Sequence, residues 1–98
     1  MSKVTFKKTA DYHIEWEIVG NQCHIHCLVF NFSNSVLKRG YVEFVRLRRF
    51  VGEMGYTYMV SVTPNPKFCE LFGAFSVGTA PNGNEVMIWE IPKRPCNG

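Results

Sequence analysis

Two histidines and two glutamates lie close together in the sequence, and their side chains are of the kinds that move protons. His24 and His26 are two residues apart, as are Glu15 and Glu17. Residues two apart in a strand share one face. Histidine titrates near neutral pH, which makes His26, with Glu17, a candidate general base. Zinc binding would use the same residue types, but we favour a solvated polar ladder and assign no metal site. Each cross-strand ion pair in such a ladder contributes less than about 1 kcal/mol.

The elements that must position these side chains are two strands of a hairpin. Residues 12–19 alternate apolar and polar side chains, a pattern typical of a half-buried strand. Gly20 and Asn21 predict a two-residue turn before a strand over 23–32. That turn places Glu17 opposite His24, and the other glutamate opposite the other histidine.

The alternation fails in the second half of this second strand. Leu28, Val29 and Phe30 are consecutive apolar residues. Such a run indicates burial on both faces or a bulge that shifts the register, and we expect a bulge between Cys27 and Phe30.

A long helix is predicted over residues 36–54. Ser33 to Ser35 supply N-cap chemistry, and Gly55 suits the position after the C-terminus. An apolar stripe recurs at helical spacing and is widened by Leu37, Tyr41 and Val45. The stripe consists of Gly40, Phe44, Leu47, Val51 and Met54.

Three arginines, Arg39, Arg46 and Arg49, lie on the other side of this helix, and the chain carries a net charge of +3. An arginine stripe can bind nucleic acid, but Glu43 and Glu53 interrupt this one. We favour an ordinary solvated helix face, with Arg46 and Arg49 as the candidate contacts to a protein partner.

The remainder of the chain predicts short strands around one short helix. Asn65 is placed to cap a helix that begins at Pro66 and ends at Gly73. Phe68, Leu71 and Phe72 share one side of it. The predicted strands are 3–7, 56–62, 74–77 and 85–91, and Asn82 with Gly83 predicts the last hairpin turn.

The predicted order is therefore β-β-β-α-β-α-β-β, an α+β fold with a mixed sheet. The segments 23–32 and 56–62 should be parallel neighbours joined by a right-handed crossover. We expect one domain over residues 1–92 and a basic tail over 93–98, which contains Lys93 and Arg94.

The four cysteines indicate reduced, largely buried thiols in a cytoplasmic protein. They show no zinc-ribbon spacing, and no signal peptide is recognisable. No apolar run reaches the ~18 residues that a membrane span needs. The cysteines are Cys23, Cys27, Cys69 and Cys96.

The predicted order, together with the segment from Asn65 to Ala74, resembles the GNAT superfamily of acyl-CoA N-acetyltransferases. The resemblance covers nearly the whole chain, except that the two helices the family inserts after its first strand are missing. It implies that the two central parallel strands splay apart. It also implies that acetyl-CoA would contact Val29 and Phe30 in the splay and Lys38, Arg39 and Gly40 at the helix start. The resemblance also makes Asn65, which begins the short helix that follows, a candidate contact to the cofactor.

Two departures from the family pattern affect the implied activity. The family's pyrophosphate turn reads Gln/Arg-x-x-Gly-x-Gly/Ala, and here only Gly40 matches, with Leu37 and Val42 at the flanking positions. The family often uses a tyrosine of the short helix as general acid, and the nearest residues here are Glu70, Leu71 and Phe72.

A narrower similarity is to small acetyltransferase-like proteins of tailed bacteriophages. From it we expect a phage-encoded protein that acts by protein binding, as a virion component or on a host protein, with a degenerate acetyl-CoA site. The alternative is an active N-acetyltransferase with a divergent pyrophosphate turn, in which His26 or Glu17 takes the proton from the amine.

Overall fold

The computed structural model describes residues 3–91, and its elements follow the order predicted from the sequence. The tail with Lys93 and Arg94, and also Cys96, lie outside the described residues. The elements are β1 (Val4–Lys8), β2 (Tyr12–Val19), β3 (Gln22–Val29), α1 (Asn34–Glu53), β4 (Tyr58–Thr63), α2 (Pro66–Leu71), β5 (Phe75–Thr79) and β6 (Glu85–Glu90).

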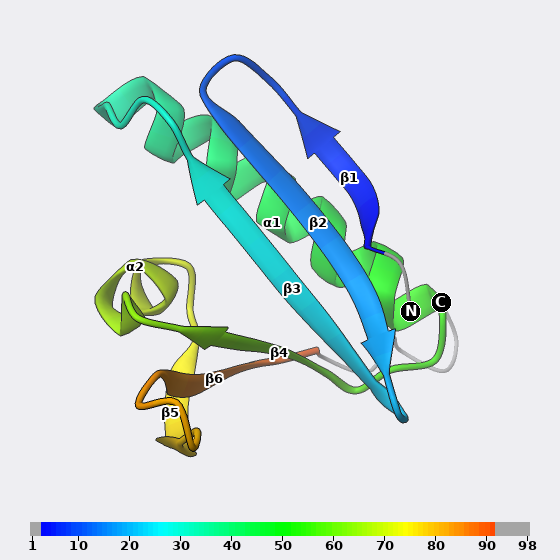
Figure 1. Cartoon of the computed structure of the whole chain (residues 1–98). Coiled ribbons are helices and arrows are strands. Elements are labelled where there is room, and N and C mark those ends of the chain that lie inside the picture. Colours follow the sequence, from blue (N-terminus) through cyan, green and yellow to red (C-terminus); the bar gives the residue numbers. More distant parts are fainter. Residues whose placement is uncertain (1–2, 92–98) are drawn as a thin grey trace.

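The six strands form one mixed sheet in the order β1-β2-β3-β4-β6-β5. Every neighbouring pair is antiparallel except β3 and β4, which are parallel and are joined through α1. Figure 1 shows β4 leaving the foot of β3 at a wide angle, with α1 behind β2 and β3. The predicted parallel neighbours are therefore confirmed, as is the compact α+β class.

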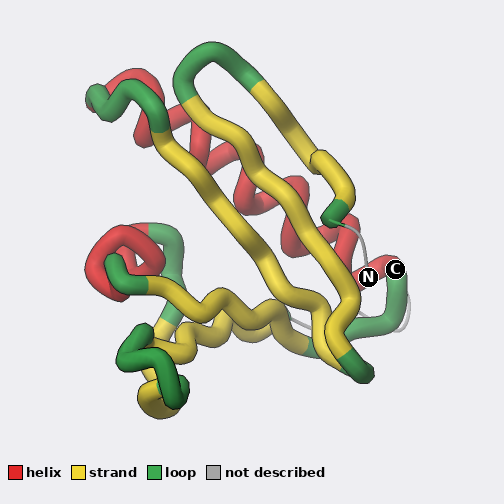
Figure 2. Tube along the Cα trace, viewed as in Figure 1, coloured by secondary structure: helices red, strands yellow, loops and turns green. Residues whose placement is uncertain are grey.

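The β2–β3 hairpin has the register that its sequence predicts. Gly20 and Asn21 form the turn, and Gly20 takes a φ of 63°, which glycine adopts readily. Glu17 pairs with His24, and the alternate apolar residues pair with one another on the opposite face. Figure 2 shows this hairpin as the two longest strands of the sheet.

The prediction of a bulge between Cys27 and Phe30 is wrong. The pairing of β3 with β2 runs without a shift to Val29. Leu28 and Phe30 alternate with Val29 and keep 54% and 55% of their surface exposed. The apolar run is thus explained by two uncovered side chains on the outer face of the sheet, and not by a bulge.

Helix α1 begins at Asn34, two residues before the predicted start. The hydroxyl of Ser33 accepts a hydrogen bond from the Val36 N–H at 3.2 Å and caps the helix. The buried side of the helix is narrower than predicted, because Tyr41 and Val45, which were expected to widen it, are exposed. The buried residues of the helix are Val36, Gly40, Glu43, Phe44, Leu47 and Val51.

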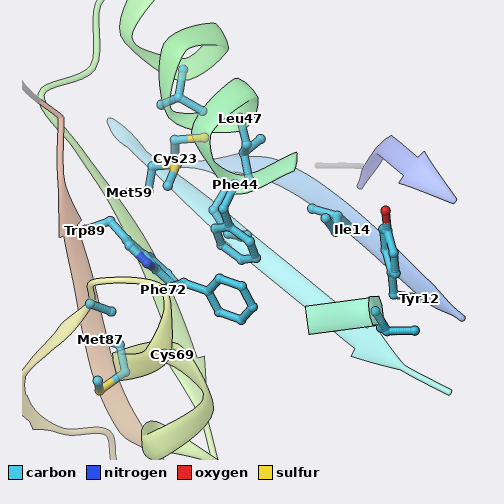
Figure 3. Packing of buried hydrophobic residues seen from close by; sticks show 14 residues of the cluster. Tyr12, Ile14, Cys23, Phe44, Leu47, Met59, Cys69, Phe72, Met87 and Trp89 are labelled. Carbon is cyan, nitrogen blue, oxygen red and sulfur yellow. The ribbon is translucent and has the colours of Figure 1, made fainter. Parts of the chain in front are cut away.

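One hydrophobic core joins both helices to the sheet. Phe44 of α1 stacks on Phe72, at the C-terminus of α2, with ring centroids 4.6 Å apart, and contacts Trp89 of β6 at 5.3 Å. Figure 3 shows these rings together beside the β3 strand, with Leu47 and Met59 in the same cluster. Because α1 and α2 share this core, the position of α2 depends on aromatic packing against α1.

Two helical glycines provide a test of this packing. A Cβ at Gly40 would lie 3.5 Å from the Phe72 ring, which is ordinary contact, whereas one at Gly52 would lie 2.9 Å from Ile91 Cγ2. Gly40→Ala should therefore raise the free energy of unfolding by about 0.5–1 kcal/mol. Gly52→Ala should raise the free energy of unfolding by less, or should lower it, because Ile91 must shift. Urea denaturation of both variants measures the difference, and a larger gain at Gly52 would contradict it.

Candidate functional site

The parallel strands β3 and β4 part soon after they meet. They pair only at Cys23 with Met59 and at His24 with Val60. Beyond this point a shallow apolar cleft, largely filled by its lining side chains and partly open to solvent, lies between β3, α1 and α2. It is lined by Tyr12, Ile14, Cys27, Val29, Phe32, Val36, Leu37, Gly40, Phe44, Phe68 and Phe72.

Aromatic rings form one wall of the cleft. Phe72 contacts Phe68 at 5.1 Å between centroids, and Phe68 contacts Phe32 at 6.4 Å. Leu71, predicted to share this side, is instead exposed. The helix α2 is only six residues long. Two of the three predicted apolar side chains line the cleft. The wall leaves an uncharged surface that suits apolar groups.

Asp11 holds the far end of β3 to α1. Its carbonyl oxygen accepts hydrogen bonds from the N–H groups of Phe30 at 2.7 Å and Asn31 at 3.2 Å. Its carboxylate accepts a hydrogen bond from Arg39 at 2.8 Å. No local sequence pattern marks Asp11 as a site residue, although the hairpin register places it opposite Phe30. Asp11 therefore fixes where the chain leaves the sheet.

The predicted cofactor residues are separated in the structure. Val29 and Gly40 line the cleft, whereas Phe30 faces the other side of the sheet. Lys38 and Arg39 are exposed on α1, and Arg39 forms the ion pair with Asp11. Asn65 is exposed before α2 and makes no side-chain cap hydrogen bond.

Gly40 does not lie at the open start of the helix. Because α1 begins at Asn34, Gly40 is in the second turn, where backbone N–H groups bond within the helix. Its Cα surface is covered by the Phe72 ring. An anion would find no free N–H group at Lys38, Arg39 or Gly40.

His26 and Glu17 do meet, but on the face of the sheet opposite the cleft. His26 Nε2 lies 2.7 Å from Glu17 Oε1. Both residues alternate with the cleft-facing residues of their strands, such as Cys27. His24 lies on the same outer face, with its Nε2 3.2 Å from the Gln22 side-chain oxygen. The pair therefore belongs to a hydrogen-bonded ladder on the outer face, and neither side chain faces the cleft.

The thiols of the described residues are poor nucleophiles. Burial raises the pKa of Cys27 to about 12 and that of Cys69 to about 11. Burial also raises the pKa of Cys23 to about 11. A thiol with such a pKa stays protonated near neutral pH, so these residues serve as packing groups.

The histidine ladder predicts a loss of stability in acid. Burial, with a smaller contribution from His26, lowers the pKa of His24, and the hydrogen bond from His26 lowers the pKa of Glu17. The His24 contribution is complete above its unfolded pKa of about 6.5 and is lost as pH falls through its folded value. The Glu17 contribution is lost at lower pH, beginning near about 4.5.

Wild-type protein should therefore unfold at lower urea concentration at about pH 5.5 than at about pH 7.5. His24→Gln should reduce that difference, because the glutamine does not titrate. An unchanged difference in the variant would show that other groups produce it.

The predicted partner residues lie on the outer side of α1. Arg46 and Arg49 are exposed, and Arg46 is 3.4 Å from the Glu43 carboxylate. Three apolar residues of the same helix are at least half exposed, namely Tyr41, Val42 and Val45. The face combines positive charge with apolar surface.

Neither described helix is both long enough and apolar enough to cross a membrane. Within residues 3–91, no three histidine, cysteine, aspartate or glutamate side chains come together as metal ligands. Comparison of the chain with protein-family models, curated proteins and solved structures gives no match.

Proposed function

We propose that this protein is a small protein-binding domain with a GNAT-like fold and a degenerate acetyl-CoA site. Three features support the GNAT-like relationship. They are the order of the elements, a parallel pair that splays after two residue pairs, and a long helix that connects the two splayed strands. These features concern the sheet and the splay, so they support a shared architecture and not a shared reaction.

The position of Gly40 is the observation that best supports a protein without acetyl transfer. A pyrophosphate needs free N–H groups at a helix N-terminus. Gly40 is instead inside α1 and is packed under Phe72. The guanidinium of Arg39, the residue before Gly40, is 2.8 Å from the Asp11 carboxylate.

The groups that would carry the chemistry are also displaced. The His26–Glu17 pair faces away from the cleft, and the N–H of Phe30 already donates to Asp11. Glu70, Leu71 and Phe72 stand where the family often has a tyrosine acid. A reacting amine held in the cleft would have no base beside it.

The partner in this proposal is a protein, bound in part through Arg46 and Arg49 of α1. A tailed bacteriophage is the proposed source, and the protein would act in the virion or in the host cytoplasm. The mixed basic and apolar surface of α1 supports a protein partner over nucleic acid, because phosphate binding gains little from Tyr41, Val42 and Val45.

One observation favours the alternative, an active N-acetyltransferase. Because the N–H of Phe30 donates to Asp11, the N–H of the preceding residue, Val29, is directed away from β2 and toward the splay, where it would polarise a thioester carbonyl. Thermal unfolding in the presence of acetyl-CoA separates the two functions. A working site at a hundredfold excess over Kd would stabilise the fold by about 2.7 kcal/mol.

We expect no shift in the melting temperature at millimolar acetyl-CoA. Tripolyphosphate at equal ionic strength is the control, because it reports any non-specific binding of anions to a basic chain. A concentration-dependent rise with acetyl-CoA, but not with tripolyphosphate, would overturn the binding-only function and establish the cofactor site.

A further inference from the structure

The inner edge of β3 lacks a strand partner over half of its length. On one side β3 pairs with β2 from Gln22 to Val29, while on the other its pairing with β4 ends at His24. Figure 1 shows the two strands diverging from this point. The sheet therefore contains an unpaired strand edge in its middle.

The backbone groups on this edge can be identified from the hairpin. In an antiparallel pair, successive residues direct their N–H and C=O groups alternately toward and away from the partner. The N–H of Phe30 donates to Asp11, across the pair. Val29 and Cys27 therefore direct their N–H and C=O groups into the splay, where no residue of β4 pairs with them.

The outer edges of the sheet carry bulges or lysines, whereas this inner edge carries neither. Edge strands are commonly blunted by bulges and lysines. The register of β1 shifts between Thr5 and Lys7, and β1 carries Lys7 and Lys8. The register of β5 shifts between Ser76 and Gly78. The edge of β3 is regular and carries no charged side chain from Cys27 to Val29.

The surfaces on both sides of this edge are apolar. On the outer face, Leu28 and Phe30 are 54% and 55% exposed. On the cleft face, Val29 lines the cleft, and Phe32 beside it is 62% exposed. An occupant that follows the edge must place apolar groups on both faces.

We propose that an extended peptide segment of another protein adds as a strand to β3 in the splay. Its backbone exchanges hydrogen bonds with Cys27 and Val29, and its central residues are uncharged and apolar on both faces. This is the chemistry of β-strand addition, in which the backbone gives affinity and the alternate side chains give specificity. A second copy of the chain does not fit, because its described outer strands are bulged. The proposal goes beyond the protein-binding function, since it holds whether or not α1 contacts a partner.

The free protein offers a first test. In hydrogen exchange monitored by NMR, the amides of Cys27 and Val29 should exchange faster than those of His26 and Leu28, which face β2. Equal protection of all four amides would contradict an unpaired β3 edge.

The second test uses a library of short random linear peptides, selected on the full chain. Selected peptides should contain consecutive apolar residues and should protect the Cys27 and Val29 amides in the complex. Leu28→Lys and Phe30→Lys should each weaken binding at least about tenfold, as should N-methylation of alternate peptide amides. Val77→Lys, a substitution at a similarly exposed valine of β5, is the matched control and should leave binding unchanged.

Three outcomes would overturn the proposal. One is the absence of enrichment over the bare matrix, and another is binding that is insensitive to Leu28→Lys and to N-methylation. The third is binding lost in Arg49→Glu and retained in Leu28→Lys, which would leave the protein-binding function intact and move the contact to α1. A response to acetyl-CoA bears on the proposed function and not on this edge.

Discussion

Replacing Phe72 with alanine is expected to lower the free energy of unfolding by about 3–5 kcal/mol. The side chain is 5% exposed and lies between α1 and α2. Its ring stacks on Phe44 at 4.6 Å and contacts Phe68 at 5.1 Å. Removing it opens a cavity under Gly40 that the short helix α2 is too constrained to fill. Urea denaturation followed by circular dichroism measures the loss.

Phe75→Ala is the matched control for this prediction. Phe75 follows Phe72 by three residues but is 44% exposed at the start of β5. Its replacement should cost about 1 kcal/mol or less. Equal losses at the two positions would contradict the assignment of Phe72 as the residue that joins α2 to α1. Folded Phe72→Ala protein would also show whether the Gly40 backbone becomes accessible once the ring is gone.

The hairpin of β2 and β3 could be predicted in detail, because its determinants are local. Gly20 and Asn21 fix the turn, and period-two alternation fixes which residues face the core. The pairing of Glu17 with His24 follows from these two facts alone. The parallel neighbours β3 and β4 also followed, since a long helix between two strands implies a crossover.

The apolar run in β3 could not be interpreted from the sequence. Hydrophobicity predicts burial, but Leu28 and Phe30 lie on an outer face that neither described helix covers. A bulge and an exposed apolar face give the same sequence pattern. Only the register with β2, which runs unshifted to Val29, separates them.

The candidate site depended on contacts between residues far apart in the chain. The ion pair of Asp11 with Arg39 and the packing of Phe72 on Gly40 join segments that local patterns do not relate. The apolar stripe predicts a start at Val36, its first apolar residue, whereas the helix begins at Asn34 because Ser33 provides the cap. This two-residue difference moved Gly40 from the first turn to the second.

The alternation of buried and exposed side chains along β3 predicts a large difference in stability between two lysine substitutions. Ile25→Lys places a charge at a position that is 1% exposed, and should cost more than about 4 kcal/mol. Leu28→Lys, on the same strand and 54% exposed, should change stability by about 0.5 kcal/mol or less. Near-ultraviolet circular dichroism reports whether each variant folds, and urea denaturation measures the variants that do.

Ile25→Ala keeps the comparison quantitative if the lysine variant does not fold, with an expected loss of about 2–4 kcal/mol. A bulge before Leu28 would turn this residue toward the core, and Leu28→Lys would then be as costly as Ile25→Lys. The near-neutral result is expected because Leu28 shares the outer face with His24 and His26. Since a folded Leu28→Lys protein keeps the splay intact, any loss of peptide binding in it reports on the β3 edge and not on the fold.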